Sequence, residues 1–204
     1  MIRLVILSFF AFFSYLSLLS ASTIMILGDS ISAGYGVSLD NAWPSILEAE
    51  LRNEHQIVNA SISGDTSSGG LSRLQEGLDA FKPDVVVIEL GGNDGLRGLS
   101  LEALEENLAM IVFKALEAGT EILICGMQIP SNYGPLYAGA FEEIYYDLAQ
   151  DLGIPLVPRF IEAVALKDEM MQSDGIHPNE RGHEELAHLV FPYILEALER
   201  VASK

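Results

Sequence analysis

Cysteine and basic residues are scarce in this sequence of 204 residues. The single cysteine, Cys125, cannot form a disulfide within the chain, which excludes a small scaffold held together by disulfides. Only 11 Lys and Arg residues stand against 29 Asp and Glu residues, and the formal net charge is −18. Nucleic acid and anionic membrane surfaces are themselves negatively charged, so this balance argues against both as principal partners.

Long hydrophobic runs are also lacking, with one exception at the start of the chain. Arg3 precedes an apolar stretch of 16 residues at positions 4–19, and small residues follow at 20–22. This order is typical of an export signal, whereas 16 residues are slightly short for a bilayer span. We therefore expect residues 1–21 to be an export signal and residues 22–204 to form a periplasmic or secreted domain without stable membrane insertion. An uncleaved membrane anchor is the alternative.

Short apolar runs alternate with segments of helical periodicity through the rest of the chain. The runs are rich in Val and Ile and lack strict polar–apolar alternation, which is typical of strands buried on both faces of a parallel sheet. They span residues 23–27, 57–60, 85–90, 122–127 and 155–157. This alternation predicts an α/β fold, a three-layer α/β/α sandwich around a mainly parallel five-stranded sheet. No repeat or linker interrupts it, so we expect one domain, and a monomer.

Four polar, glycine-containing segments follow predicted strands or precede the last helix. They span residues 28–34, 59–66, 91–95 and 174–179. Ligands bind beyond the carboxyl ends of the strands in such a sheet, so these segments should meet at one edge. Each segment alone could equally be a helix cap or a turn. Their joint placement is what indicates a site.

Residues of these segments suit nucleophilic catalysis. Ser30, at a predicted strand-to-helix turn, would expose its hydroxyl, which needs a base to act as a nucleophile. His177 is the natural base because imidazole titrates near neutral pH. Asp174 can accept the Nδ1 proton of His177 and leave Nε2 free for Ser30. The backbone amides of Ser30 and Gly64 and the side-chain amide of Asn93 could stabilise an oxyanion.

Taken together, the four segments resemble the signature blocks of the SGNH, or GDSL, hydrolase superfamily. They read ILGDSISAG from Ile26, NASISGDTS from Asn59, ELGGNDGLRG from Glu89 and DGIHPN from Asp174. The resemblance covers nearly the whole chain after the leader, and it extends to the bacterial periplasmic thioesterase I, lysophospholipase and arylesterase type.

This resemblance implies a role for each matching residue. Ser30 would be the nucleophile and first oxyanion donor, Gly64 and Asn93 would complete the oxyanion hole, and His177 would be the base with Asp174 as its partner. It implies hydrolysis of small-molecule carboxylic esters and acyl thioesters through an acyl-enzyme, with no metal or organic cofactor. In the family the loop after the asparagine block lines the acyl site, which suggests substrate contacts for the following residues: Gly95, Leu96, Leu99, Tyr133 and Ile176.

Other functional classes remain open. A metal-dependent hydrolase could gather Asp29, Asp65, Asp94, Asp174 and His177, although no second histidine lies at ligand spacing. A non-catalytic acyl-binding or carbohydrate-binding domain could keep the same fold. Among ester hydrolases, a carbohydrate acetylesterase is the alternative.

Two further expectations concern the last helix, at about residues 180–201. Pro192 lies inside it and should kink or split it. His183 and His188, like His55, stand among polar residues and are expected on the solvated surface.

Overall fold

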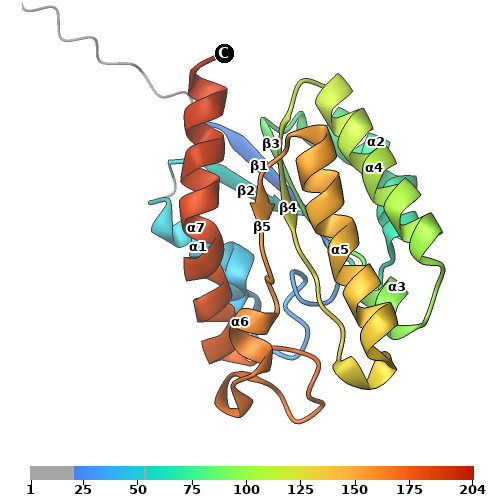
Figure 1. Ribbon diagram of the computed structural model, residues 1–204. Helices are drawn as coiled ribbons and strands as arrows, with labels where there is room; N and C mark the ends of the chain where they lie inside the picture. Colours follow the sequence, from blue (N-terminus) through green and yellow to red (C-terminus); the bar gives the residue numbers. More distant parts are fainter. Residues whose placement is uncertain (1–20, 53) are drawn as a thin grey trace, which may run out of the picture.

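Five strands form one sheet at the centre of the molecule (Figure 1). The computed structural model describes residues 21–52 and 54–204. The strands are β1 (Thr23–Gly28), β2 (Gln56–Asn59), β3 (Val85–Glu89), β4 (Glu121–Cys125) and β5 (Leu156–Val157). Their order is β2-β1-β3-β4-β5, and every neighbouring pair is parallel. The predicted export signal at residues 1–21 lies, but for its last residue, outside the described residues.

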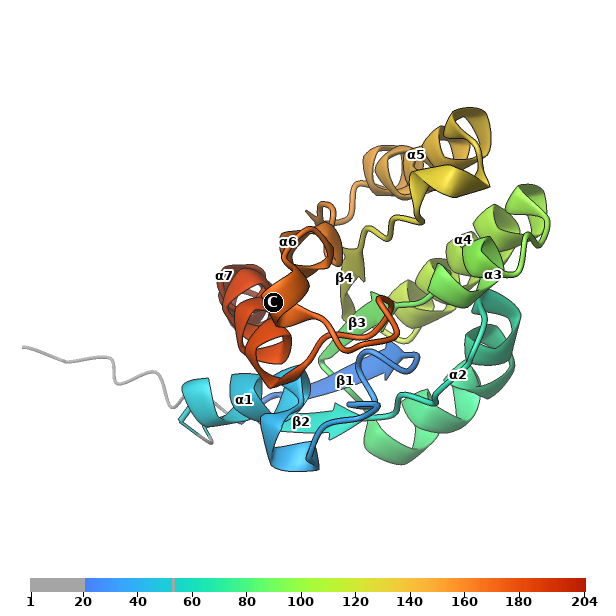
Figure 2. The same cartoon turned by 90° about the horizontal axis from the view of Figure 1, so that it is seen from below.

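Helices cover both faces of this sheet, as the view from below shows (Figure 2). One layer holds α1 (Trp43–Glu50), α6 (Glu162–Ala165) and α7 (Glu180–Ala202). The other holds α2 (Ser67–Phe81), α4 (Leu101–Glu117) and α5 (Pro135–Leu152), with the short α3 (Gly92–Leu96) beside them. Every residue of β3 is buried, as expected for a strand covered on both faces. The predicted three-layer α/β/α sandwich with a parallel five-stranded sheet is therefore confirmed.

Side-chain caps begin three of the long helices. The Thr66 hydroxyl accepts the N–H of Gly69 at the start of α2, and Ser100 accepts the N–H of Ala103 at the start of α4. Asn179 accepts two N–H groups at the start of α7. Such caps satisfy amides that the helix itself leaves unpaired. The caps of α2 and α7 also fix the point at which two of the predicted site segments end.

Pro192 was expected to kink or split the last helix, and the split is wrong. α7 is one continuous helix from Glu180 to Ala202, with Pro192 inside it. Pro192 lies on the exposed side, while Val190 and Ile194 on the other side are fully buried. Burial of such side chains stabilises by about 2 kcal/mol each, and a row of them outweighs the hydrogen bond that proline removes. Among the described residues, no helix is both long enough and apolar enough to cross a bilayer.

Candidate active site

The carboxyl ends of the parallel strands bring three of the predicted site residues into hydrogen-bonding distance. Ser30 follows β1, and the loop before α7 carries Asp174 and His177. Ser30 Oγ lies 2.9 Å from His177 Nε2, although the two residues are 147 positions apart. His177 Nδ1 lies 2.7 Å from Asp174 Oδ2. The hydroxyl, the imidazole and the carboxylate thus form one continuous chain of hydrogen bonds.

Backbone amides hold the Asp174 carboxylate in place. Its Oδ1 accepts the N–H groups of His177 at 3.0 Å and of Ile176 at 2.9 Å. The hydrogen bond from the backbone of His177 contributes most, the ring of His177 adds to it, and the pKa of Asp174 falls to about 2 despite some desolvation. Asp174 is therefore ionised at neutral pH and holds His177 in the tautomer with the proton on Nδ1.

Gln172 connects the loop before α7, which carries His177 and which we call the histidine loop, to the loop after β1, which carries Ser30 and Tyr35. Its Nε2 donates to the carbonyl of Tyr35 at 2.7 Å and to that of Pro178 at 2.8 Å. Its backbone N–H donates to the carbonyl of His177 at 2.8 Å. The Tyr35 ring lies 4.5 Å from the His177 ring, so these contacts set where the imidazole stands. Sequence reasoning missed both Gln172 and Tyr35, because neither belongs to a polar segment at a strand end.

Two buried acidic residues, Asp29 and Glu89, form hydrogen bonds to the turn that carries Ser30, which we call the serine turn. Glu89, the last residue of β3, is 0% exposed, and its Oε2 accepts the hydroxyl of Ser32 at 2.6 Å and the N–H of Asp29 at 3.2 Å. Asp29 accepts the N–H of Ile31 at 3.0 Å and the side-chain amide of Asn93 at 2.9 Å. Burial raises the pKa of Asp29 to about 6. Burial, and then the nearby charge of Asp29, raises the pKa of Glu89 well above its ordinary value.

Glu89 was missed because it closes a run of valine and isoleucine that predicts only a strand. A carboxyl group inside such a run is itself the signal, since buried acids are rare unless they are hydrogen-bonded. The expectation that His183 is solvated is also wrong. His183 is 0% exposed and its Nδ1 accepts the N–H of Trp43 at 3.2 Å. Burial lowers its pKa to about 4, so it is neutral at neutral pH.

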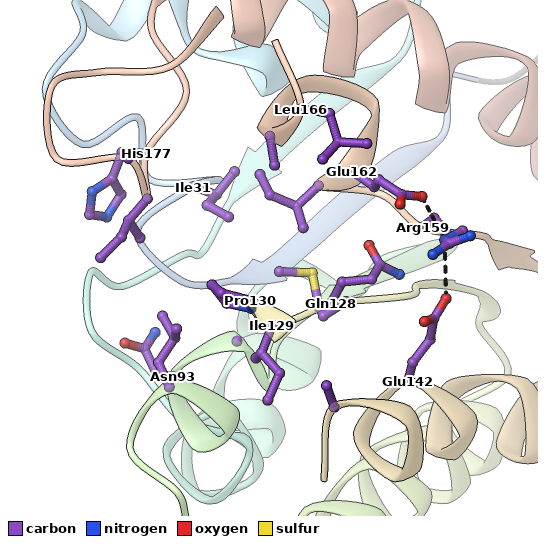
Figure 3. A pocket seen from close by; sticks show the side chains of 18 of the residues that line it. Ile31, Asn93, Gln128, Ile129, Pro130, Glu142, Arg159, Glu162, Leu166 and His177 are labelled. Carbon is purple, nitrogen blue, oxygen red and sulfur yellow. Dashed lines mark ion pairs between the residues drawn. The ribbon is translucent and has the colours of Figure 1, made fainter. Parts of the chain in front are cut away.

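The two other predicted oxyanion donors come from separate segments, and only Asn93 lines the cavity that contains Ser30. Asn93 lies in the first turn of α3 and faces the cavity that Ser30 and His177 also line (Figure 3). Gly64 lies in the loop after β2 with a φ of +81°, a conformation that favours glycine. Arg97 connects the two, because its guanidinium donates to the carbonyl of Gly64 at 2.9 Å and lies 3.5 Å from Asn93 Oδ1.

A cavity of about 750 Å³ extends from Ser30, Asn93 and His177 between α5 and α6 (Figure 3). Of the predicted substrate contacts, Leu96 and Ile176 line it. Gly95 is buried in α3, where an added Cβ would meet Ile129 and Phe141. Leu99 and Tyr133 lie outside the lining, and the Tyr133 hydroxyl donates to the carbonyl of Leu96 at 2.9 Å.

The acidic residues considered for a metal site lie apart. Asp65 pairs with Arg73 at 2.7 Å, Asp94 accepts the hydroxyl of Ser67 at 2.6 Å, and Asp29 holds Asn93. Within residues 21–52 and 54–204, no three His, Cys, Asp or Glu side chains are grouped so as to hold a metal ion. The arrangement that the metal alternative requires is therefore not formed by these side chains.

Known proteins are similar to this chain in both fold and sequence. The model of the GDSL-like lipase/acylhydrolase family matches residues 26–185. Esterase TesA of Pseudomonas aeruginosa is 46% identical over 176 residues, which cover 85% of this chain and 88% of the relative. Thioesterase 1/protease 1/lysophospholipase L1 of Escherichia coli K12 is 48% identical over 160 residues, 78% of this chain and 77% of the relative.

A crystal structure of TesA superposes with a TM-score of 0.83 at 45% identity, and it covers 86% of this chain and 99% of TesA. The psychrotrophic esterase EstA from Pseudoalteromonas sp. also has a TM-score of 0.83, at 35% identity, with 87% of this chain and 99% of EstA covered. The chain is thus an α/β/α hydrolase of ester bonds. It belongs to the GDSL-like lipase/acylhydrolase family.

Proposed function

We propose that this enzyme hydrolyses carboxylic esters and acyl thioesters by a serine mechanism, with Ser30 as nucleophile, His177 as base and Asp174 as the partner of His177. One observation carries the proposal. Ser30 Oγ is 2.9 Å from His177 Nε2, and His177 Nδ1 is 2.7 Å from Asp174 Oδ2. A nucleophile within reach of a base, and a base oriented by a third group, are what serine catalysis requires.

The reaction would run in two halves. In the first, Ser30 Oγ attacks the carbonyl carbon while His177 Nε2 takes the hydroxyl proton, and His177 then protonates the leaving alcohol or thiol as the acyl-enzyme forms. In the second, His177 removes a proton from water, which attacks the acyl-enzyme and releases the acid. The backbone N–H groups of Ser30 and Gly64 and the side-chain amide of Asn93 would bind the oxyanion in each half. Asp174 stays ionised and stabilises the imidazolium, and no cofactor enters this scheme.

The apolar part of the cavity lining supports acyl groups longer than acetyl. Apolar side chains line the cavity beyond Ser30: Ile31, Leu96, Met127, Ile129 and Ile161. The relatives named above are called esterase, thioesterase and lysophospholipase, and we extend ester and thioester substrates to this chain from them. A relative named acetylxylan esterase, from Xylanibacter ruminicola, is only 28% identical. An acetyl group is too short to contact much of the apolar lining, so this lining favours longer acyl groups over acetyl.

We also propose that residues 1–21 direct export, and that residues 22–204 act as a monomer in the periplasm or outside the cell. N-terminal sequencing of the exported protein and light scattering would test these two points.

The mechanism is tested by Ser30→Ala, with Ser72→Ala as the matched control on an exposed helix position. We expect Ser30→Ala to abolish hydrolysis of p-nitrophenyl butyrate and Ser72→Ala to retain it. A fluorophosphonate should label the parent on the peptide that contains Ser30, and excess EDTA should leave the rate unchanged. Full activity of Ser30→Ala, or a label on another residue, would refute the mechanism.

A further inference from the structure

An ion-paired cluster stands at one end of the catalytic cavity, away from Asn93 and His177 (Figure 3). Arg159 Nε lies 3.2 Å from Glu142 Oε1 and 2.6 Å from Glu162 Oε2. The three residues come from the loop after β5, from α5 and from α6, and all three line the cavity. We call them the Arg159 cluster.

Between the cluster and the reacting groups, the cavity wall is apolar. Ile31, Ile129 and Pro130 lie in this stretch (Figure 3). Ile31 and Ile129 are 6% and 7% exposed, so they form a fixed, packed surface. Each methylene that an alkyl chain places on such a wall leaves water and strengthens binding by about fourfold, which corresponds to ~0.8 kcal/mol.

The position of Arg159 is fixed by its backbone. Its φ is +51°, a left-handed conformation that a non-glycine residue adopts rarely, and only where its surroundings impose it. The next residue, Phe160, donates its N–H to the carbonyl of Gly126 at 2.8 Å, and the N–H of Glu162 donates to the carbonyl of Arg159 at 3.1 Å. The turn therefore fixes where the Arg159 side chain begins, and the two ion pairs hold its guanidinium between the carboxylates.

Polar groups at this end would resist an alkyl chain. The cluster carries two carboxylates against one guanidinium, with side chains that are 26% to 52% exposed and so retain water. The nearby Gln128 has a buried Oε1 that accepts no hydrogen bond from any described residue. A methylene placed here would displace water from charged and polar atoms without replacing their hydrogen bonds, which is unfavourable.

We propose that the Arg159 cluster ends the acyl-binding part of the cavity and thereby limits the enzyme to short and medium acyl chains. This inference rests on the proposed function, because acylation of Ser30 is what places an alkyl chain along the apolar wall. Arg159 acts here on specificity and takes no part in the bond changes.

The parent enzyme provides the first test, with p-nitrophenyl esters from C2 to C14, each below its critical micelle concentration. We expect kcat/KM to rise by about fourfold per methylene while the chain covers the apolar wall. Beyond that length, and before C14, kcat/KM should level off or fall. A steady rise through C14 would overturn the inference.

The second test replaces the cluster by apolar residues in the variant Glu142→Leu/Arg159→Met/Glu162→Leu. We expect its break point to move to longer chains by two carbons or more, so that kcat/KM for the first esters beyond the parent's limit rises at least tenfold. The rate on the C4 ester should stay within threefold of the parent. The control Glu121→Leu/Arg200→Met removes an ion pair of 3.0 Å at the opposite end of β4, and its length profile should match the parent.

The outcomes separate the two proposals. If Ser30→Ala is inactive on the C4 ester and the triple variant has the parent's length profile, the cluster has no role in specificity and the serine mechanism stands. If Ser30→Ala is fully active, both fail. Circular dichroism and the C4 rate report whether the triple variant is folded. If it is not, the profile of the parent decides alone.

Discussion

The carboxyl group of Glu89 accepts the hydroxyl of Ser32 at 2.6 Å, two residues beyond the proposed nucleophile. The same oxygen accepts the backbone N–H groups of Asp29 and Ser32, and the Ser32 oxygen accepts the indole N–H of Trp43 at 3.1 Å. A buried hydrogen-bonded network therefore holds the serine turn in place, and Asp29 links that network to Asn93.

Replacing Glu89 should show how much this network contributes to stability. Glu89→Leu leaves a hydroxyl and two N–H groups without an acceptor in the interior, so we expect the free energy of unfolding to fall by about 3 kcal/mol or more. Glu89→Gln keeps an acceptor oxygen and resembles the protonated acid that the raised pKa favours, and should lose no more than about 1 kcal/mol. Urea unfolding followed by circular dichroism measures both. Equal losses in the two variants would show that the hydrogen bonds are not what matters.

The raised pKa of Asp29 predicts a contribution to stability that falls as the pH rises. Asp29 has a pKa of about 6 in the folded chain against an ordinary 3.8, so between about pH 4 and 6 the folded state holds a proton that the unfolded state has released. Glu89 acts in the same direction. The lowered pKa of His183, about 4 against an ordinary 6.5, acts across the same window with the opposite sign, and the lowered pKa of Asp174 does so below it.

Unfolding of the parent and of Asp29→Asn at pH 4, 5, 6 and 7 would measure this effect. The two proteins share every other titratable group, so their difference reports Asp29 together with its effect on Glu89. Between about pH 4 and 6 we expect the free energy of unfolding of the parent to fall relative to that of Asp29→Asn, and a constant difference between the two proteins would contradict the assignment.

The sequence predicts those features of the fold and the site that depend on neighbouring residues along the chain. The valine and isoleucine of β3 predict a buried strand because every one of its side chains must lie against a helix layer. Ser30 and His177 could be placed at one edge because parallel strands all end on the same side of their sheet. A hydroxyl beside an imidazole then indicates nucleophilic catalysis.

The parts that the sequence leaves open depend on contacts between distant segments. Gln172 acts by reaching the carbonyl of Tyr35, 137 positions away, and nothing in its own neighbourhood indicates this. His183 was misjudged from its polar neighbours along the chain. Its partners on the helix face are instead Ala187 and Val190, four and seven positions on, and both are buried. The Arg159 cluster likewise forms only when α5, α6 and the end of β5 come together.

Removing the side chain of Gln172 should impair catalysis more than stability. In Gln172→Ala the histidine loop loses its two side-chain hydrogen bonds to Tyr35 and Pro178, which lets the imidazole move relative to Ser30. A displacement of about 1 Å can cost roughly 100-fold in rate, so we expect kcat to fall by about 10- to 100-fold. The control Gln75→Ala removes an exposed bond to Asp79 on α2 and should leave kcat unchanged. Steady-state kinetics on p-nitrophenyl butyrate, with melting temperatures of all three proteins, would decide. A normal kcat in Gln172→Ala would show that the loop holds its place without this residue.

Asn93 offers the sharpest test of how the oxyanion is bound. Its Nδ2 donates one hydrogen to Asp29 at 2.9 Å, and an amide nitrogen carries a second hydrogen that can point to the substrate. An oxyanion forms only in the transition state, so Asn93→Ala should lower kcat by about 10²- to 10³-fold while KM stays within about threefold. Asn41→Ala, which removes an exposed bond to Glu180, is the matched control and should change neither constant. If KM rises and kcat is kept, Asn93 binds the ground state of the substrate. The oxyanion must then be held by backbone amides alone.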